Sequence, residues 1–231
     1  MDFFAPAYSP ERIRKLAAEA IGTFCLVFAV TGAIVINDLS AGAVTHVGIA
    51  LTFGLVVMSL VYSLGDVSGA HLNPAVTLGF WIARRFPGRD VGPYLIAQLL
   101  GAFAASGVMT ALFRHATLGA TLPAGSAGQS FALEVLLTAF LMFVILNVSI
   151  EAKEKGIMAG AAVGAVIALE ALFAGPICGA SMNPARSLAP AVMSGRVESL
   201  WVYMLAPLVG SCLGVVVFVI VRGSGNDRRK G

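Results

Sequence analysis

The tripeptide Asn-Pro-Ala occurs twice in this chain, 110 residues apart. The two copies are Asn73-Pro74-Ala75 and Asn183-Pro184-Ala185. Asparagine is a favourable helix N-cap and proline is tolerated at the first helical position, so each copy predicts a helix start. A helix start offers free N–H groups and a positive dipole end, and the asparagine amide adds hydrogen-bond donors and an acceptor. This chemistry suits a neutral solute that accepts hydrogen bonds and disfavours a proton or another cation.

Two titratable side chains flank the tripeptides. Arg186 directly follows the second copy, and a charge at membrane depth is usually functional because burying it is unfavourable. We expect its guanidinium to donate to passing solutes and to exclude cations, rather than to be a structural arginine that extends toward the interface. His71 lies two residues before Asn73. It either lines an inner vestibule, where its charge would respond to pH, or is a hydrogen-bonded loop histidine.

Three carboxylates lie in strongly apolar stretches. Glu19 and Glu134 occupy equivalent places in two such stretches. They could relay protons, but we expect them to accept hydrogen bonds from main-chain N–H groups that short intramembrane helices leave unpaired. Glu170 has three open interpretations: it holds the loop at 176–182, pairs with Arg186, or faces another subunit.

The composition is that of an integral membrane protein. Of 231 residues, 58% are hydrophobic and 12% are charged, and the mean hydropathy is +0.89, whereas soluble domains carry about 25% charged residues. The small net charge of +3 needs no nucleic-acid partner, and no metal or cofactor is predicted. We expect Cys25, Cys178 and Cys212 to be free buried thiols because they are odd in number and lie in apolar stretches.

Six stretches are long enough to cross a bilayer, which takes about 20 apolar residues. They are 16–37, 44–65, 91–113, 130–150, 156–175 and 200–221. Two segments that begin at the tripeptides, 73–83 and 183–193, are too short to cross. They fit re-entrant half-helices, which are tolerated at membrane depth where protein or a water-filled cavity surrounds them.

The basic residues predict that both termini are cytoplasmic. With that orientation only Arg114 and Arg196 fall outside, and Arg186 lies in the second half-helix. The remaining 12 of the 15 basic residues fall inside: Arg12, Arg14, Lys15, Arg84, Arg85, Arg89, Lys153, Lys155, Arg222, Arg228, Arg229 and Lys230.

The two halves of the chain resemble each other. The segment from Leu16 resembles that from Phe131, and the segment from Pro93 resembles that from Val202, at offsets of 115 and 109. Three spans in each half require the second half to be inverted, with a functional site at the midplane between the halves. We therefore predict one transmembrane channel domain, 1–231, made of repeats 1–120 and 121–231.

The runs SGAHLNPAVT at 68–77 and AGPICGASMNPARSLAP at 174–190, together with Glu19 and Glu134, resemble the aquaporin or major intrinsic protein family. The resemblance covers nearly the whole chain. It implies an all-α membrane fold of six tilted helices and two half-helices in an inverted 3+3 repeat. It also implies a homotetramer with a pore in each subunit, located in the cell membrane.

The same resemblance implies an outer constriction formed by Phe53, Ala171, Ala180 and Arg186. Water-specific members usually have histidine where this chain has Ala171. Glycerol facilitators typically have Trp, Gly and Phe where this chain has Phe53, Ala171 and Ala180. They also usually have Asp after the arginine, where Ser187 stands here. The second motif region is most similar to the nodulin-26-like branch and its bacterial relatives. That branch implies passage of water, glycerol, ammonia or neutral metalloid acids.

The sequence therefore predicts a passive channel that conducts water and small neutral solutes in single file, excludes protons and ions, and is not an enzyme. A strict water channel is one alternative. An ion-coupled secondary transporter is another, since transporters also use inverted repeats and broken helices. A structural membrane protein with a closed pore is a third.

Overall fold

The computed structural model describes residues 9–149 and 158–222, and every regular element within them is a helix. Six long helices are each apolar enough to cross a membrane. They are α1 (Pro10–Leu39), α2 (Thr45–Ser68), α4 (Gly88–Leu112), α5 (Ala127–Val148), α7 (Ala159–Cys178) and α9 (Leu200–Arg222). All six predicted spans are present. The end of the fourth span, expected at 150, and the start of the fifth, expected at 156, lie outside the described residues.

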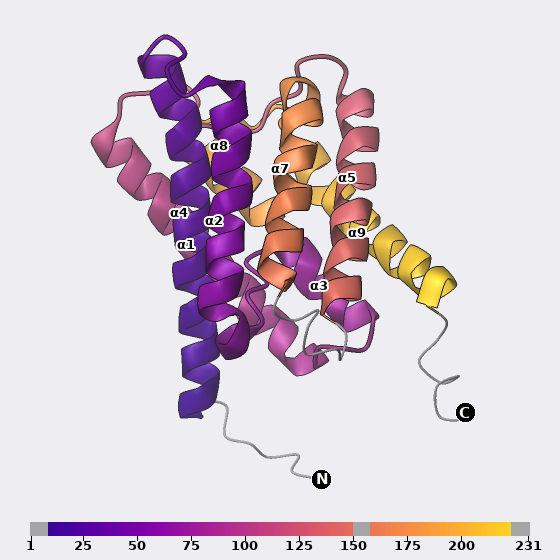
Figure 1. Cartoon of the computed structure of the whole chain (residues 1–231). Helices are drawn as coiled ribbons and strands as arrows, with labels where there is room; N and C mark the ends of the chain where they lie inside the picture. The colour runs from indigo at the N-terminus through magenta and orange to yellow at the C-terminus, as the bar shows by residue number, and fades with distance from the viewer. Residues whose placement is uncertain (1–8, 150–157, 223–231) are drawn as a thin grey trace, which may run out of the picture.

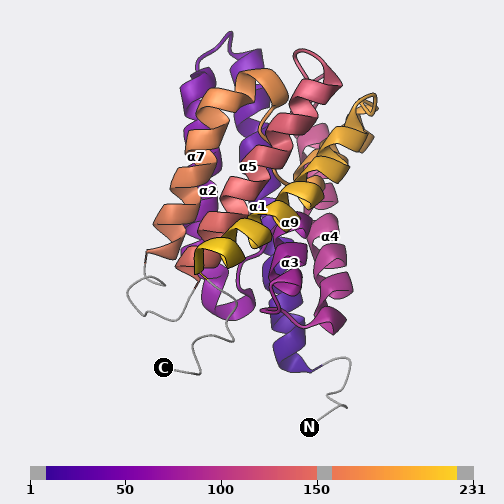
Figure 2. The same ribbon diagram turned by 90° about the vertical axis from the view of Figure 1, so that its right-hand side faces the viewer.

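The two short helices are α3 (Pro74–Ile82) and α8 (Pro184–Ser194). Figure 1 shows α3 in the half of the bundle nearer the chain termini and α8 in the other half. Each short helix packs against both α4 and α9, which run obliquely in Figure 1. Figure 2 shows α9 crossing the bundle obliquely. The predicted half-helices are thus confirmed as elements, and both sit inside the ring of long helices.

The two halves of the chain pack in corresponding pairs. Helix α1 packs on α4 as α5 packs on α9, and α1 contacts α2 as α5 contacts α7. Glycine permits the close approach in the first of these pairs, because a Cβ at Gly101 would collide with the main chain at Ala20. Gly210 faces Val135 in the same way. Small residues at such crossings let membrane helices approach closely.

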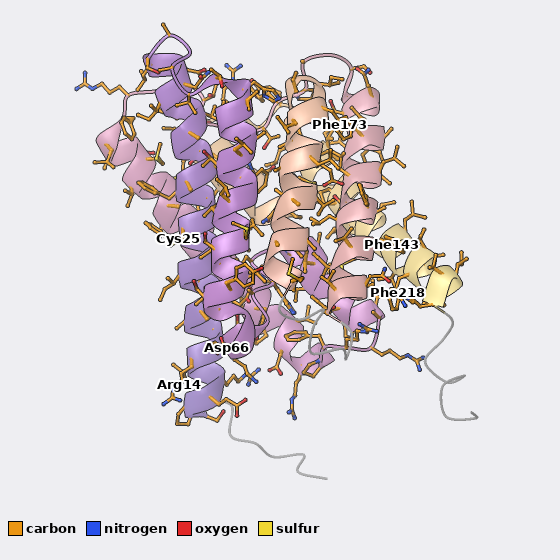
Figure 3. The ribbon with its side chains drawn as sticks, viewed as in Figure 1. Arg14, Cys25, Asp66, Phe143, Phe173 and Phe218 are labelled. Atoms are coloured by element: carbon orange, nitrogen blue, oxygen red, sulfur yellow. The ribbon has the colours of Figure 1, made fainter. Side chains whose placement is uncertain are left out.

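The outer surface of the bundle is apolar along its length. Exposed hydrophobic side chains include Phe173 on α7, which Figure 3 labels near the end of the bundle away from the termini. Charged side chains such as Arg14 and Asp66 lie at the opposite end. The three cysteines are free, but the expectation that all are buried is wrong. Cys178 is buried, whereas Cys25 is half-buried and Cys212 is exposed on the apolar surface of α9.

Candidate pore and its supporting contacts

Both tripeptides begin a helix with the asparagine as N-cap, as predicted. The Asn73 Oδ1 accepts a hydrogen bond from the Ala75 N–H at 2.9 Å. The Asn183 Oδ1 accepts from the N–H groups of Ala185 at 3.0 Å and Arg186 at 3.3 Å. In each case the side-chain oxygen satisfies N–H groups that a helix start would otherwise leave free.

The amide nitrogens of the same asparagines join the two halves of the chain. The Asn73 Nδ2 donates to the Met182 carbonyl at 2.7 Å, and the Asn183 Nδ2 donates to the Leu72 carbonyl at 2.9 Å. These reciprocal bonds bring the starts of α3 and α8 together in the middle of the bundle. Each NH₂ group has two hydrogens, so one donor per asparagine is left for another acceptor.

A cavity of about 40 Å³ lies beside this contact. A cavity needs about 10–15 Å³ to hold a water, so this one is large enough for water. Its polar wall consists of the two asparagines and the loop residues that precede them. The other walls are apolar and come from α1, α2, α5 and α7, with Leu26, Phe53, Val57, Leu141 and Ile167 among the lining residues.

The loops before α3 and α8 have unusual backbone conformations. Ala70 and Leu72 in the first loop have φ values of 46° and 52°, and Ala180 and Met182 in the second have 42° and 54°. Left-handed conformations are unfavourable for residues other than glycine and persist only where the surroundings enforce them. These loops must therefore be held by strong contacts on the side away from the cavity.

Glu19 and Glu134 make those contacts. The Glu19 carboxylate accepts from the N–H groups of His71 at 2.9 Å and Leu72 at 2.7 Å. The Glu134 carboxylate accepts from the N–H groups of Ser181 and Met182, both at 2.7 Å. Both glutamates are fully buried. The pairing is the same in the two halves, because each carboxylate oxygen takes one main-chain N–H of its loop.

Further supporting residues were not identified from the sequence. The Tyr94 hydroxyl donates to the Ser68 carbonyl at 2.9 Å, and the Tyr203 hydroxyl donates to the Cys178 carbonyl at 2.8 Å. Each tyrosine thus anchors the end of the long helix that leads into a loop. The sequence did contain a signal, because the two tyrosines are aligned in the repeat. The Gln98 side chain also supports this site, because its amide donates to Glu19 at 2.8 Å. No matching residue in the other half of the chain drew attention to Gln98.

Arg186 is 1% exposed and is directed toward the loop that joins α4 to α5. Its Nη1 donates to the Gly119 carbonyl at 3.1 Å and to the Thr121 hydroxyl at 2.6 Å. Within the described residues its Nε has no hydrogen-bond partner. Sequence reasoning missed Gly119 and Thr121, since neither belongs to a motif.

The structure gives the four expected filter residues different surroundings. Phe53 lines the central cavity. Ala171 and Ala180 are buried in the same apolar cluster as Phe53, yet neither they nor Arg186 line that cavity. A constriction formed by all four residues therefore stays a prediction.

His71 lies between the central cavity and a wider opening. It lines both the 40 Å³ cavity and a cavity of about 680 Å³ on the side of the termini, whose walls also include Lys15 and Asp66. Its ring stacks on Phe80 with centroids 4.6 Å apart, and its Nδ1 is hydrogen-bonded to the Thr77 hydroxyl at 3.1 Å. The side chain is therefore both hydrogen-bonded and adjacent to the opening.

Glu170 matches none of its three interpretations. It is fully buried within a single chain, so it does not face another subunit. Neither carboxyl oxygen has a hydrogen-bond partner among residues 9–149 and 158–222, so no described residue of the loop at 176–182 is held by it. No ion pair joins it to Arg186 in that same part of the chain.

Six spanning helices around two half-helices that meet at a small cavity define a transmembrane channel. Comparisons with known proteins agree. The family model described as Major intrinsic protein matches residues 7–218. Aquaporin NIP1-1 of Oryza sativa subsp. japonica is 48% identical over 226 residues, which are 97% of this chain and 80% of the relative. Nodulin-26 of Glycine max is 46% identical, over 91% of this chain and 78% of its own length.

Among solved structures, the aquaglyceroporin from Plasmodium falciparum has a TM-score of 0.79 at 26% identity, covering 90% of this chain and 95% of that one. The chain belongs to the major intrinsic protein family, within which it resembles the nodulin-26-like proteins. It is a multi-pass membrane channel for water and small neutral solutes.

Proposed function

We propose that this channel conducts glycerol-sized polyols or neutral metalloid acids in addition to water. The observation that carries the proposal is alanine at positions 171 and 180, where the predicted constriction has no large side chain. Phe53 supplies an apolar surface for the carbon skeleton of a solute, and Arg186 supplies a donor for its hydroxyl groups. The similarity to nodulin-26-like aquaporins and to an aquaglyceroporin supports the same solute range.

Asn73 and Asn183 act as the central contact in this proposal. Their Oδ1 atoms are occupied by the half-helix N–H groups, so only an N–H of each amide is left for the solute. A water or hydroxyl at this point must therefore present its oxygen to both asparagines. The two positive helix ends at the same place disfavour a cation. The solute passes without any bond being made or broken, so the protein acts as a passive channel and not as an enzyme.

Glu19 and Glu134 serve to hold the two loops in this arrangement, because each accepts two main-chain N–H groups from a loop with left-handed residues. His71 lies where solutes would enter from the side of the termini, and we assign it to the inner vestibule.

The termini are proposed to be cytoplasmic and the membrane to be the cell membrane. Basic residues gather where the termini lie, at the start of α1, between α3 and α4 and at the end of α9 (Figure 1). This distribution follows the positive-inside rule. The apolar outer surface is shared between lipid and further copies of the chain, which assemble as a homotetramer with one pore in each subunit.

Stopped-flow measurements on proteoliposomes test the proposal. Water, glycerol, urea, boric acid and arsenite are compared with empty liposomes, with and without sodium and proton gradients. We expect gradient-independent fluxes of water and of at least glycerol or a metalloid acid. Passage of water alone would make the protein a strict water channel, and flux that requires a gradient would make it a coupled transporter. Permeability equal to that of empty liposomes would indicate a closed structural protein.

A further inference from the structure

The loop that binds Arg186 contains a tight turn whose backbone conformation is unfavourable and has to be held in place by other contacts. The loop crosses the face of the molecule away from the termini, between α4 and α5 (Figure 1). The Ala120 N–H donates to the Thr117 carbonyl at 2.8 Å, which closes a four-residue turn. Its central residues, Leu118 and Gly119, have φ values of 49° and 70°. Two left-handed residues in succession define a type I′ turn, which glycine adopts readily and leucine does not.

One end of this turn is anchored in the apolar core. The Leu118 side chain is 4% exposed and packs with Val35 of α1 and Met109 of α4. Gly119 lies directly against α1, since a Cβ there would be 2.9 Å from the Thr31 Cα. These contacts fix the position of the turn but do not explain how Leu118 is kept in its unfavourable conformation.

The His115 imidazole supplies that constraint. Its Nδ1 accepts hydrogen bonds from the N–H groups of Leu118 at 3.2 Å and Thr117 at 3.4 Å. Because two main-chain donors point at Nδ1, this nitrogen carries no proton, and the ring hydrogen is on Nε2. The Nε2 lies 3.2 Å from the Asp38 carboxylate at the end of α1. Asp38 therefore selects the ring form that leaves Nδ1 free to accept.

The turn and the residue that follows Ala120 present the two acceptors that hold the Arg186 guanidinium: the Gly119 carbonyl at 3.1 Å and the Thr121 hydroxyl at 2.6 Å. The Thr121 hydroxyl is also hydrogen-bonded to the Ser187 hydroxyl at 2.8 Å, so it is oriented toward this region. A chain of contacts thus runs from Asp38 through His115 and the turn to Arg186.

We propose that His115 is a positioning residue that sets the solute selectivity of the channel through Arg186. With the imidazole in place, the turn retains the guanidinium against the loop. Without it, Leu118 relaxes from its left-handed conformation, the Gly119 carbonyl moves away, and Arg186 is free to extend into the constriction. An extended arginine obstructs glycerol more than water. The proposal rests on the proposed role of Arg186 in the filter.

The test measures the ratio of glycerol to water permeability in proteoliposomes containing equal amounts of folded protein. In His115→Ala the ratio should fall by about fivefold, the change expected when one hydrogen bond to a charged group is weakened. In His115→Asn the amide oxygen can replace Nδ1 as the acceptor, so the ratio should return close to that of the wild type. Asp38→Ala, which changes a half-exposed side chain, should lower the ratio less than His115→Ala.

The matched control is Arg196→Ala, which removes a different loop side chain and its 3.6 Å ion pair with Glu198, and the ratio should not change. Because the effect passes through Arg186, His115→Ala should have no further effect in an Arg186→Val background. An unchanged ratio in His115→Ala, or an equal loss in His115→Asn, would overturn the proposal.

If His115→Ala does not fold, Asp38→Ala and His115→Asn test the proposal instead. An unchanged ratio of glycerol to water permeability in Asp38→Ala, or a large fall in that ratio in His115→Asn, would refute the role of His115. The proposed function fails separately, if the wild type conducts neither glycerol nor a metalloid acid. An unchanged ratio in Arg186→Val would remove Arg186 from the filter and would refute the role of His115, but not conduction itself.

Discussion

At the scale of single residues, two of the buried acidic side chains that look alike in the sequence have opposite surroundings. Both Glu134 and Glu170 are fully buried. Glu134 accepts two main-chain N–H groups at 2.7 Å, whereas both oxygens of Glu170 lack a partner among the described residues. A buried polar group without a hydrogen bond is destabilising, so these two carboxyls should contribute to stability with opposite sign.

The variant Glu170→Leu should accordingly raise the free energy of unfolding by about 1–3 kcal/mol, the usual effect of removing an unsatisfied buried polar group. Glu134→Leu should lower it by at least about 2 kcal/mol, because two buried N–H groups lose their acceptor. Thermal unfolding in detergent measures both. A lower melting temperature for Glu170→Leu would show that the carboxyl of Glu170 has a partner such as a buried water.

Ala171 is the residue at which the width of the constriction can be tested. Replacing Ala171 by histidine adds bulk and a polar ring, so glycerol permeability should fall by about tenfold or more while water permeability is largely kept. The comparison variant is Leu169→Ala, on the outer face of the same helix and half exposed, which should change neither flux. Unchanged glycerol flux in Ala171→His would remove Ala171 from the filter.

At the scale of elements, the sequence predicted the helices and the contacts that hold the two half-helix loops, but not the connection between α4 and α5. Asparagine followed by proline predicted the two short helix starts, and the long apolar runs located all six spans. Among the bounds that lie on described residues, each agrees to within about three residues except the start of α1, which begins at Pro10 and not at 16. The aligned Glu19 and Glu134 indicated the loop contacts. The connection between α4 and α5 was not predicted, since Gly119 acts through its main-chain carbonyl and the side chains of Thr121 and His115 contact Arg186 and Asp38, which are far away in sequence.

Helix crossings offer a direct test of close packing. In Gly101→Ala the new methyl group would collide with the main chain at Ala20, so we expect destabilisation by about 1–3 kcal/mol from overpacking. Gly107 lies in the same helix, and a Cβ there meets nothing within 4 Å. Gly107→Ala should therefore stabilise the protein by up to about 1 kcal/mol through helix propensity. Equal melting temperatures for the two variants would argue against a tight α1–α4 contact.

At the scale of the whole molecule, the apolar belt must be covered on all sides. Exposed hydrophobic side chains such as Ile21, Leu55, Leu136 and Phe173 occur on α1, α2, α5 and α7, so these helices face lipid or other copies of the chain. For the proposed homotetramer, native mass spectrometry from mild detergent should give four times the 23.8 kDa chain mass. A dominant single-chain mass under several detergents would contradict that assembly.

The reciprocal bonds between the asparagines and the opposite loops also constrain how the protein is made. The partner of the Asn73 amide is the Met182 carbonyl, 109 residues later in the chain. While the ribosome is still synthesising the second half, the first half-helix cannot form this bond. Its polar start then depends on water or the insertion machinery for hydrogen bonds. The centre of the molecule therefore cannot be completed before the second half has been made, and neither half of the chain contains all the partners needed to close it.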